Sequence, residues 1–302
     1  MMSVEAATRR EFVVGGLAFA GLLAGCATDQ QEAAPTPTTR EINDSRGPVD
    51  VPIAPTRPVA LVGSAEIDMI ALGLTPVFSG AFATGWVDLA PETITSSLLP
   101  PDPEQVAATR PDLLLGWDWL AEDTAWNEVR DLAPLVTLPS GNDWRGVFQL
   151  VADAVNRKER ANELLTQFDE RVAKLKNANA ARKISVNVVG VFEPGTFWWW
   201  DAPYPVNAHL TSVGLDVHSP TETAKGVSLE RLTELTADWL IVTAPKGDKD
   251  GLANKLVEHP LAKKLPSVAK NQVHIVDRDL WGGAGLMWAN ALLDDVERLY
   301  PV

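Results

Sequence analysis

Short apolar runs alternate with helically periodic segments along the first half of the chain. The apolar runs predict strands at residues 59–62, 75–78, 111–115 and 135–138. Between them, the pattern predicts helices at residues 65–72 and 103–108, and Gly73 ends the first of these. Short buried strands that alternate with helices are typical of a parallel sheet with helices on both faces.

A longer helical pattern follows and predicts a connection between two parts of the chain. Apolar residues recur at helical spacing from residue 144 to about residue 178, and no Gly or Pro interrupts residues 147–181. The pattern predicts one helix, or two helices joined by a kink near Arg157 and Lys158. A helix of about 30 residues is about 45 Å long, which is more than one small lobe needs.

The strand and helix pattern starts again after this segment. Apolar segments lie at residues 184–192, 196–200, 206–213, 229–235, 239–243, 252–257, 273–276 and 287–299. Their order is similar to that of the first half. We therefore predict an α/β fold of two Rossmann-like lobes with parallel sheets, at residues 47–145 and 182–302. One long rigid helix, at residues 146–181, is expected to join them, with a ligand cleft between the lobes.

The N-terminus predicts export and lipid anchoring rather than a buried apolar segment. Arg9 and Arg10 precede an apolar run that ends just before Cys26. The run is shorter than the roughly 20 residues of a membrane-spanning helix. Its flanks resemble a twin-arginine signal and a bacterial lipobox. This implies removal of residues 1–25 and a lipid on Cys26 at the outer face of the cytoplasmic membrane, with residues 26–46 as a flexible tether.

Charge and motif content exclude several classes of function. The 302 residues carry a formal net charge of −14, which repels nucleic acid and disfavours adsorption onto anionic lipid. Cys26 is the single cysteine, so no intrachain disulfide can form. The sequence contains no nucleophile elbow, HExxH, paired CxxC or Walker loop, so we do not expect an enzyme. An exported hydrolase that uses Asp118 or Asp201 as an acid is the remote alternative.

Several short phrases follow one another in a recognisable order. Pro-Thr-Arg-Pro-Val at residues 55–59 precedes Ala-Leu-Gly-Leu-Thr-Pro-Val at residues 71–77. Pro-Glu-Gln-Val and Arg-Pro-Asp-Leu-Leu lie within residues 103–114, and a similar arrangement recurs within residues 228–241. Over about residues 47–301, the order and spacing resemble the solute-binding proteins of ABC importers for siderophores, haem and cobalamin.

The resemblance implies a monomeric extracytoplasmic receptor that binds a ferric siderophore and delivers it to the permease dimer of an ABC transporter. It implies no cofactor, because iron arrives as part of the bound siderophore. A haem-binding or cobalamin-binding receptor of the same fold is the alternative. The resemblance also assigns permease docking to Glu104 and Glu230, each of which begins a short helix. A carboxylate there can instead serve the helix dipole alone.

Eleven tryptophans against two tyrosines predict indole side chains both in the core and in a ligand cleft. On an extended segment Trp198 and Trp200 share one face, so we assign these two to the ligand and Trp199 to the core. The other candidates follow strand ends or lie on loops. The predicted ligand-binding residues are Trp86, Trp117, Trp119, Trp198, Trp200, Tyr204, Trp281 and Arg278.

The class of cargo depends on charge and on metal-binding side chains. Arg145 and Arg278 are possible anion contacts, with plain surface exposure as the alternative. Because cations are few in the predicted cleft loops, a hydroxamate-type siderophore is favoured over a tricatecholate one. Residues 47–150 contain no His, Tyr or Cys, which disfavours haem or bare metal held between two lobes. Haem held from one side by Tyr204 or His209 stays open.

Overall fold

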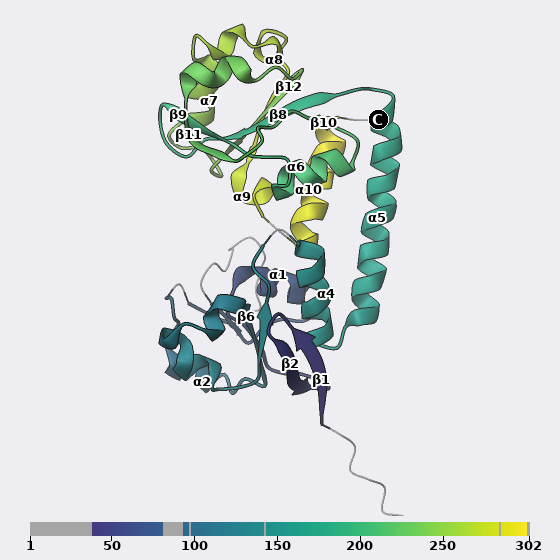
Figure 1. Cartoon of the computed structure of the whole chain (residues 1–302), viewed down its shortest axis with the longest axis vertical. Coiled ribbons are helices and arrows are strands. Elements are labelled where there is room, and N and C mark those ends of the chain that lie inside the picture. Colours follow the sequence, from purple (N-terminus) through teal and green to yellow (C-terminus); the bar gives the residue numbers. More distant parts are fainter. Residues whose placement is uncertain (1–37, 81–92, 97, 142, 284, 301–302) are drawn as a thin grey trace, which may run out of the picture. The chain divides into compact units, whose positions relative to one another are not determined.

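Two larger β-sheets flanked by helices, and one two-stranded sheet, make up the part of the chain that the structure describes (Figure 1). The computed structural model describes residues 38–80, 93–96, 98–141, 143–283 and 285–300, all in one compact unit. The expected export signal, Cys26 and Trp86 lie outside these residues. Within them, no helix is long and apolar enough to cross a membrane.

The first sheet is parallel, in the order β5-β4-β3-β6-β7. Its strands are β3 (Pro58–Ala60), β4 (Phe78–Ser79), β5 (Ile94–Thr95), β6 (Leu113–Trp117) and β7 (Leu135–Leu138). Its helices are α1 (Gly63–Ala71), α2 (Pro103–Ala108) and α3 (Asn127–Arg130), with 3-10 helices η1 (Asp118–Ala121) and η2 (Thr124–Trp126). The predicted parallel sheet is confirmed. α2 and β7 have the predicted bounds, and α2 begins where expected because Asp102 caps it and Pro103 occupies its first turn.

The second sheet is mixed, in the order β11-β9-β8-β12-β13, and β10 also pairs with β8. Its strands are β8 (Ser185–Gly190), β9 (Thr196–Trp199), β10 (Asp216–Val217), β11 (Ala224–Ser228), β12 (Trp239–Ala244) and β13 (Val273–Asp277). β9 runs antiparallel to both β8 and β11, whereas β8, β10, β12 and β13 are parallel. The expected all-parallel sheet is therefore corrected at β9 and β11. A tight turn around Gly195, whose φ is 81°, returns the chain at once instead of sending it through a crossover helix.

The helices of the second half follow the predicted order. They are α6 (Pro205–Ser212), α7 (Leu252–Glu258), α8 (Pro266–Ala269), α9 (Arg278–Trp281) and α10 (Leu286–Leu299), with 3-10 helices η3 (Leu229–Glu234) and η4 (Ala262–Lys264). The chain enters this half through α5, and α10 closes it by packing against α1, α4 and α5.

Two helices, rather than one, occupy the predicted connection: α4 (Trp144–Ala154) and α5 (Lys158–Ala180). The kinked alternative is confirmed, and the single unbroken helix is wrong. The break lies at Asn156, whose φ of 56° is left-handed, a conformation that Asn tolerates well, and whose Nδ2 donates to the carbonyl of Ile53 at 2.9 Å. Because α4 packs on α1 and β7, the connecting segment shortens to α5, about 35 Å long.

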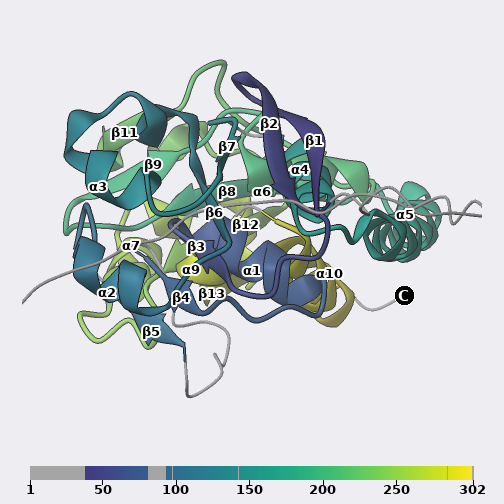
Figure 2. The same cartoon turned by 90° about the horizontal axis from the view of Figure 1, so that it is seen from below.

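A β-hairpin precedes the first sheet, where β1 (Thr39–Asp44) pairs antiparallel with β2 (Gly47–Pro52). The prediction that a flexible tether extends to residue 46 is therefore wrong from β1 onward. Ile42 and Val51 are buried, because alternate residues of a strand face the same side. Figure 2 shows the two strands beside α4, and β1 contacts both α4 and β7. In β1, Ile42 is the one apolar residue, so the alternation of this strand is hard to recognise in the sequence.

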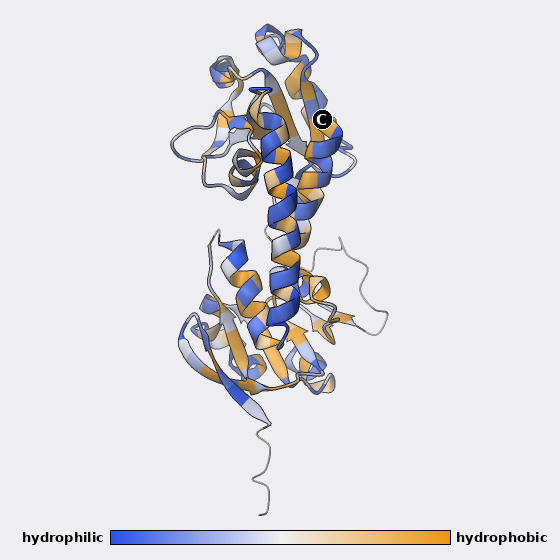
Figure 3. Cartoon of the chain, turned by 90° about the vertical axis from the view of Figure 1, so that its right-hand side faces the viewer, coloured by the Kyte–Doolittle hydropathy of each residue, from blue (hydrophilic) through white to orange (hydrophobic). Residues whose placement is uncertain are grey.

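Two apolar clusters form the core. The larger contains buried residues of both sheets, such as Leu114 of β6 and Ile241 of β12, together with Leu292 of α10. The smaller includes Phe197 and Val242 and covers the opposite face of the second sheet, since neighbouring residues of β12 face opposite sides. Figure 3 shows that the visible side of α5 is largely hydrophilic, and its buried apolar residues are Ala161, Leu165, Phe168 and Leu175. The connecting helix is thus a partly exposed element beside a core that continues from one sheet to the other.

Asp44 joins the hairpin turn to β7. Its carboxylate accepts hydrogen bonds from the backbone N–H groups of Arg46 (2.8 Å), Gly47 (3.1 Å) and Thr137 (2.8 Å), and from Thr137 Oγ1 (2.6 Å). A single side chain therefore satisfies donors on two segments that are far apart in the sequence.

We expect Asp44→Ala to lower the free energy of unfolding by about 1–3 kcal/mol, because it leaves partly buried donors without an acceptor. Urea denaturation of the purified protein measures this. Asp50→Ala is the matched control, since the structure gives this exposed carboxylate no partner among the described residues. Equal effects of the two substitutions would contradict the assigned role of Asp44.

Candidate ligand-binding site

The carboxyl end of β6 carries two of the predicted tryptophans. Trp117 is the last residue of the strand and is partly buried, whereas Trp119 in η1 is 40% exposed. The ring of Trp119 meets the buried ring of Trp126 edge-on, with centroids 6.1 Å apart. Trp119 is therefore a supported, exposed aromatic side chain at the edge of the sheet where ligands of parallel α/β folds bind.

Asp118, between these two tryptophans, lacks the properties of a catalytic acid. Ser140 Oγ donates to its carboxylate at 2.6 Å, and this hydrogen bond lowers the pKa of Asp118. A general acid needs a raised pKa so that it holds its proton near neutral pH. The geometry therefore disfavours the hydrolase alternative at this residue.

The second sheet carries a cluster of two aromatic rings and two cations, which we call the aromatic–cation cluster: Phe192, Trp198, Lys225 and Arg278. Phe192 follows β8 and is 38% exposed, and its ring stacks on that of Trp198 with centroids 4.1 Å apart. The guanidinium carbon of Arg278 lies 4.4 Å from the Phe192 centroid, and Lys225 Nζ lies 5.0 Å from the Trp198 centroid. Each ring thus has a cation over it.

Backbone position brings this cluster to one edge of the second sheet. β8 ends just before Phe192, and β13 ends just before Arg278, so both follow the carboxyl ends of parallel strands. Arg278 Nη1 donates to the carbonyl of Val191 at 3.4 Å, and its nearest carboxylate, that of Asp279, is 3.7 Å away. The cluster can offer an apolar face and two positive groups to an anionic ligand with an aromatic or aliphatic body.

Sequence reasoning identified half of the aromatic–cation cluster. Trp198 and Arg278 were predicted, whereas Phe192 and Lys225 were missed. Phe192 had a usable signal, because it is the last residue of the apolar segment at residues 184–192. Lys225 had none, because its position depends on β11 pairing with β9 through an irregular register between Ala224 and Val227.

Two of the predicted ligand-binding tryptophans lie in the core instead. Trp200 is 3% exposed and stacks on Tyr204, with centroids 5.1 Å apart and rings 17° from parallel. Trp281 is 1% exposed, and its Nε1 donates to Asp295 at 2.8 Å. These positions differ from the prediction. β9 ends at Trp199, so Trp200 has left the strand and packs over Gly190, which has no Cβ to obstruct it. Trp199 is buried, as expected.

A separate pocket of about 210 Å³ surrounds His209, with Trp144, Arg145 and Phe168 among its lining residues. His209 is buried against Trp144 and Phe168, with centroids 5.6 and 6.2 Å away. Burial, and then the charge of Arg145, lower the pKa of His209 to about 4. Arg145 itself lies over the Trp144 ring at 5.0 Å and pairs with Asp169. It is thus ion-paired, as Arg278 is with Asp279, and it lines this pocket rather than the aromatic–cation cluster.

No group of three His, Cys, Asp or Glu side chains among the described residues could hold a metal ion.

Comparisons with known proteins agree with this fold. A family model described as periplasmic binding protein matches residues 69–280. The probable siderophore-binding lipoprotein YfiY of Bacillus subtilis (strain 168) is 26% identical over 288 residues, covering 87% of this chain and 88% of YfiY. The achromobactin-binding periplasmic protein of Dickeya dadantii (strain 3937) is 24% identical over 268 residues, covering 81% of this chain and 86% of that protein.

Two solved structures have the same fold at lower identity. Staphylococcus aureus SirA complexed with staphyloferrin B has a TM-score of 0.72 and 19% identity, covering 86% of this chain and 98% of SirA. The triscatecholate siderophore binding protein FeuA of Bacillus subtilis, complexed with ferri-bacillibactin, has a TM-score of 0.68 and 19% identity, again covering 86% and 98%.

The low pKa of His209 generates a testable pH dependence. The unfolded chain binds a proton at this histidine below a pKa of about 6.5, whereas folded His209 resists protonation down to about pH 4. Neutral, buried His209 therefore makes its full contribution to the free energy of unfolding above pH 6.5. As the pH falls from 6.5 towards 4, this free energy decreases by about 1–3 kcal/mol. His209→Gln should remove this part of the pH dependence of urea unfolding, and the more exposed His218→Gln should not. A His209 ring that titrates near pH 6.5 by NMR would refute the assignment.

Proposed function

The chain belongs to the periplasmic binding protein family, and from that premise we propose that it is an extracytoplasmic lipoprotein receptor for a ferric siderophore, which it delivers to an ABC permease. The family consists of binding proteins. The observation that carries the proposal is the aromatic–cation cluster at the carboxyl edge of the second sheet. The exposed indole of Trp119, at the corresponding edge of the first sheet, supports it.

The cations over the rings of Phe192 and Trp198 bear on the charge of the cargo. The scarcity of cations in the predicted cleft loops favoured a hydroxamate-type siderophore, and this class stays a candidate. However, Arg278 and Lys225 lie over the faces of Phe192 and Trp198, so a ligand at this cluster meets positive charge together with aromatic surface. We therefore propose an iron complex with outward carboxylate or catecholate oxygens as the preferred cargo, ahead of a hydroxamate complex.

The geometry gives little support to haem. An axial tyrosine must lose its proton, but burial raises the pKa of Tyr204, whose ring is stacked on Trp200. His209 is enclosed by Trp144 and Phe168. Of the two side chains considered for one-sided haem binding, His209 is thus buried, and Tyr204 is held against Trp200 by ring stacking.

Docking to a permease dimer is proposed for the two glutamates predicted for it. Glu104 lies in the first turn of α2 and Glu230 in the first turn of η3, and both side chains are exposed. Their backbone N–H groups are already capped by Asp102 (2.9 Å) and Ser228 (3.3 Å). Because these caps satisfy the helix starts, the glutamate carboxylates are available to pair with arginines of a partner. The lipid proposed for Cys26 would hold the receptor at the membrane.

Tryptophan fluorescence titration with ferric siderophores tests the cargo. A panel of carboxylate, catecholate and hydroxamate complexes, haem and cobalamin should give quenching with an anionic siderophore. Lys225→Gln and Arg278→Gln should each weaken that binding about tenfold, because each removes a charge-assisted contact. Lys263→Gln, an exposed lysine of η4, is the control. No quenching by any siderophore would refute the receptor proposal, whereas unchanged affinity in both cluster variants would refute the preference for anionic cargo.

Uptake in cells tests the docking residues. Glu104→Ala or Glu230→Ala should leave siderophore affinity within about twofold, because an exposed carboxylate outside the ligand surface contributes little to ligand binding. Uptake should fall, and the double variant should be impaired more than either single one. Glu128→Ala in α3 is a matched exposed control. Loss of affinity parallel to loss of uptake would show that these residues have been misplaced.

A further inference from the structure

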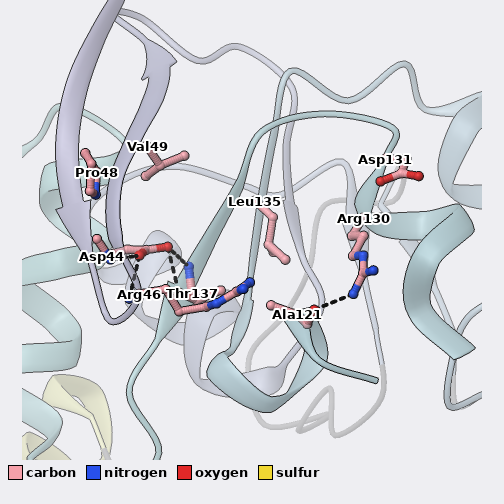
Figure 4. A pocket seen from close by; sticks show the side chains of 10 residues that line it. Asp44, Arg46, Pro48, Val49, Ala121, Arg130, Asp131, Leu135 and Thr137 are labelled. Carbon is pink, nitrogen blue, oxygen red and sulfur yellow. Dashed lines mark hydrogen bonds between the residues drawn. The ribbon is translucent and has the colours of Figure 1, made fainter. Parts of the chain in front are cut away.

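A second pocket, of about 500 Å³, lies in the first lobe beside the β-hairpin (Figure 4). None of its lining residues belongs to the aromatic–cation cluster. Three parts of the chain form it: the hairpin turn, the region from η1 to α3, and β7. The lining residues are Asp44, Arg46, Gly47, Pro48, Val49, Ala121, Arg130, Asp131, Leu135 and Thr137.

The pocket contains two guanidinium groups without an ion pair. Arg130 Nη1 donates to the carbonyl of Ala121, and neither Arg46 nor Arg130 has a carboxylate partner among the described residues. In contrast, arginines such as Arg145 and Arg171 elsewhere are ion-paired. Figure 4 shows Arg46 and Arg130 approaching Ala121 from opposite sides of the pocket. Two arginines without ion pairs thus line one pocket, together with the carboxylates of Asp44 and Asp131.

The nearest carboxylate does not neutralise this charge through an ion pair. All the hydrogen bonds found for the Asp44 carboxylate come from backbone N–H groups and Thr137 Oγ1, at 2.6–3.1 Å. Asp131 at the rim is exposed and has no partner among the described residues. Apart from the Ala121 carbonyl that accepts from Arg130, neither guanidinium has an acceptor in the pocket among the described residues.

We propose that this pocket binds a small oxyanion, a carboxylate or a phosphate, between Arg46 and Arg130. Guanidinium groups present paired N–H donors that match two oxygens of such an anion. Pro48, Val49 and Leu135 supply an apolar wall for a short hydrocarbon part of the ligand. The anion is either a free solute or the phosphate of a lipid headgroup, which share this chemistry.

Isothermal titration calorimetry of the purified protein with inorganic phosphate and with acetate tests the site. Arg46→Gln should weaken binding of phosphate about tenfold. Asp131→Asn should strengthen it about threefold, because it removes a repulsive charge at the rim. Arg157→Gln, an exposed arginine outside the pocket, should bind like the wild type. An unchanged urea midpoint establishes that each variant is folded. Absence of binding at millimolar phosphate, or unchanged binding in both pocket variants, would overturn the proposal.

Two further measurements complete the test. Arg130→Lys keeps the positive charge but loses the paired donors, so affinity should fall, and wild-type affinity in this variant would contradict the two-arginine site. The wild-type protein is sedimented with phosphatidylglycerol vesicles and with phosphatidylcholine vesicles. Sedimentation with the first kind alone, lost in Arg46→Gln, would identify the ligand as a lipid headgroup. Binding of free phosphate without sedimentation would identify a soluble anion.

Discussion

The packing of α10 against α1, α4 and α5 is the constraint on which the rest of the structure depends. α10 closes the second half of the chain, yet α1 and α4 also pack with the first sheet. Apolar residues of both sheets and of α10 belong to one cluster, so separating the sheets would expose core surface. Ion pairs between α5 and α10 stabilise this packing near the surface. Arg171 of α5 pairs with Asp294 and, at 2.9 Å, with Glu297, both of α10. The hydrogen bond from Arg171 lowers the pKa of Glu297, as a pair that favours the charged form should.

A buried acid lies within the same packing. Asp68 of α1 is 1% exposed, and its Oδ1 has no hydrogen-bond partner among the described residues. Burial raises the pKa of Asp68 well above the ordinary value, so the neutral form is favoured at this position. The carboxyl lies against Gly285, where a Cβ would be 3.2 Å from Oδ1 and where φ is 136°. Glycine at the start of α10 therefore permits both the backbone turn and the close approach of α1.

Elements that are defined by neighbouring residues could be predicted well from the sequence. Features that depend on contacts between residues far apart in the sequence could not. α2 and β7 could be placed to the residue because a cap, a proline and an apolar run define them within a few positions. The hairpin was missed because Ile42, the one apolar residue of β1, stands among polar neighbours, so that only β2, with Val49 and Val51, shows an apolar face. The residues of the candidate ligand-binding site show the same difference between local and long-range signals. Trp119 follows a strand that is obvious in the sequence, whereas the role of Lys225 depends on an irregular pairing of two strands that no local pattern specifies.

The net charge of the chain and the charges at its binding sites affect different kinds of partner. At physiological ionic strength the Debye length is about 8 Å, so most of the charges that sum to −14 are screened from a ligand already in contact with the protein. They still oppose a long polyanion such as a nucleic acid, which must lie along much of the surface. A small anion interacts instead with the groups that it touches, such as the cations 4.4 and 5.0 Å from the rings of Phe192 and Trp198. Net charge therefore excludes classes of large partner, while the choice among small ligands depends on a few side chains whose neighbours are known only from the fold.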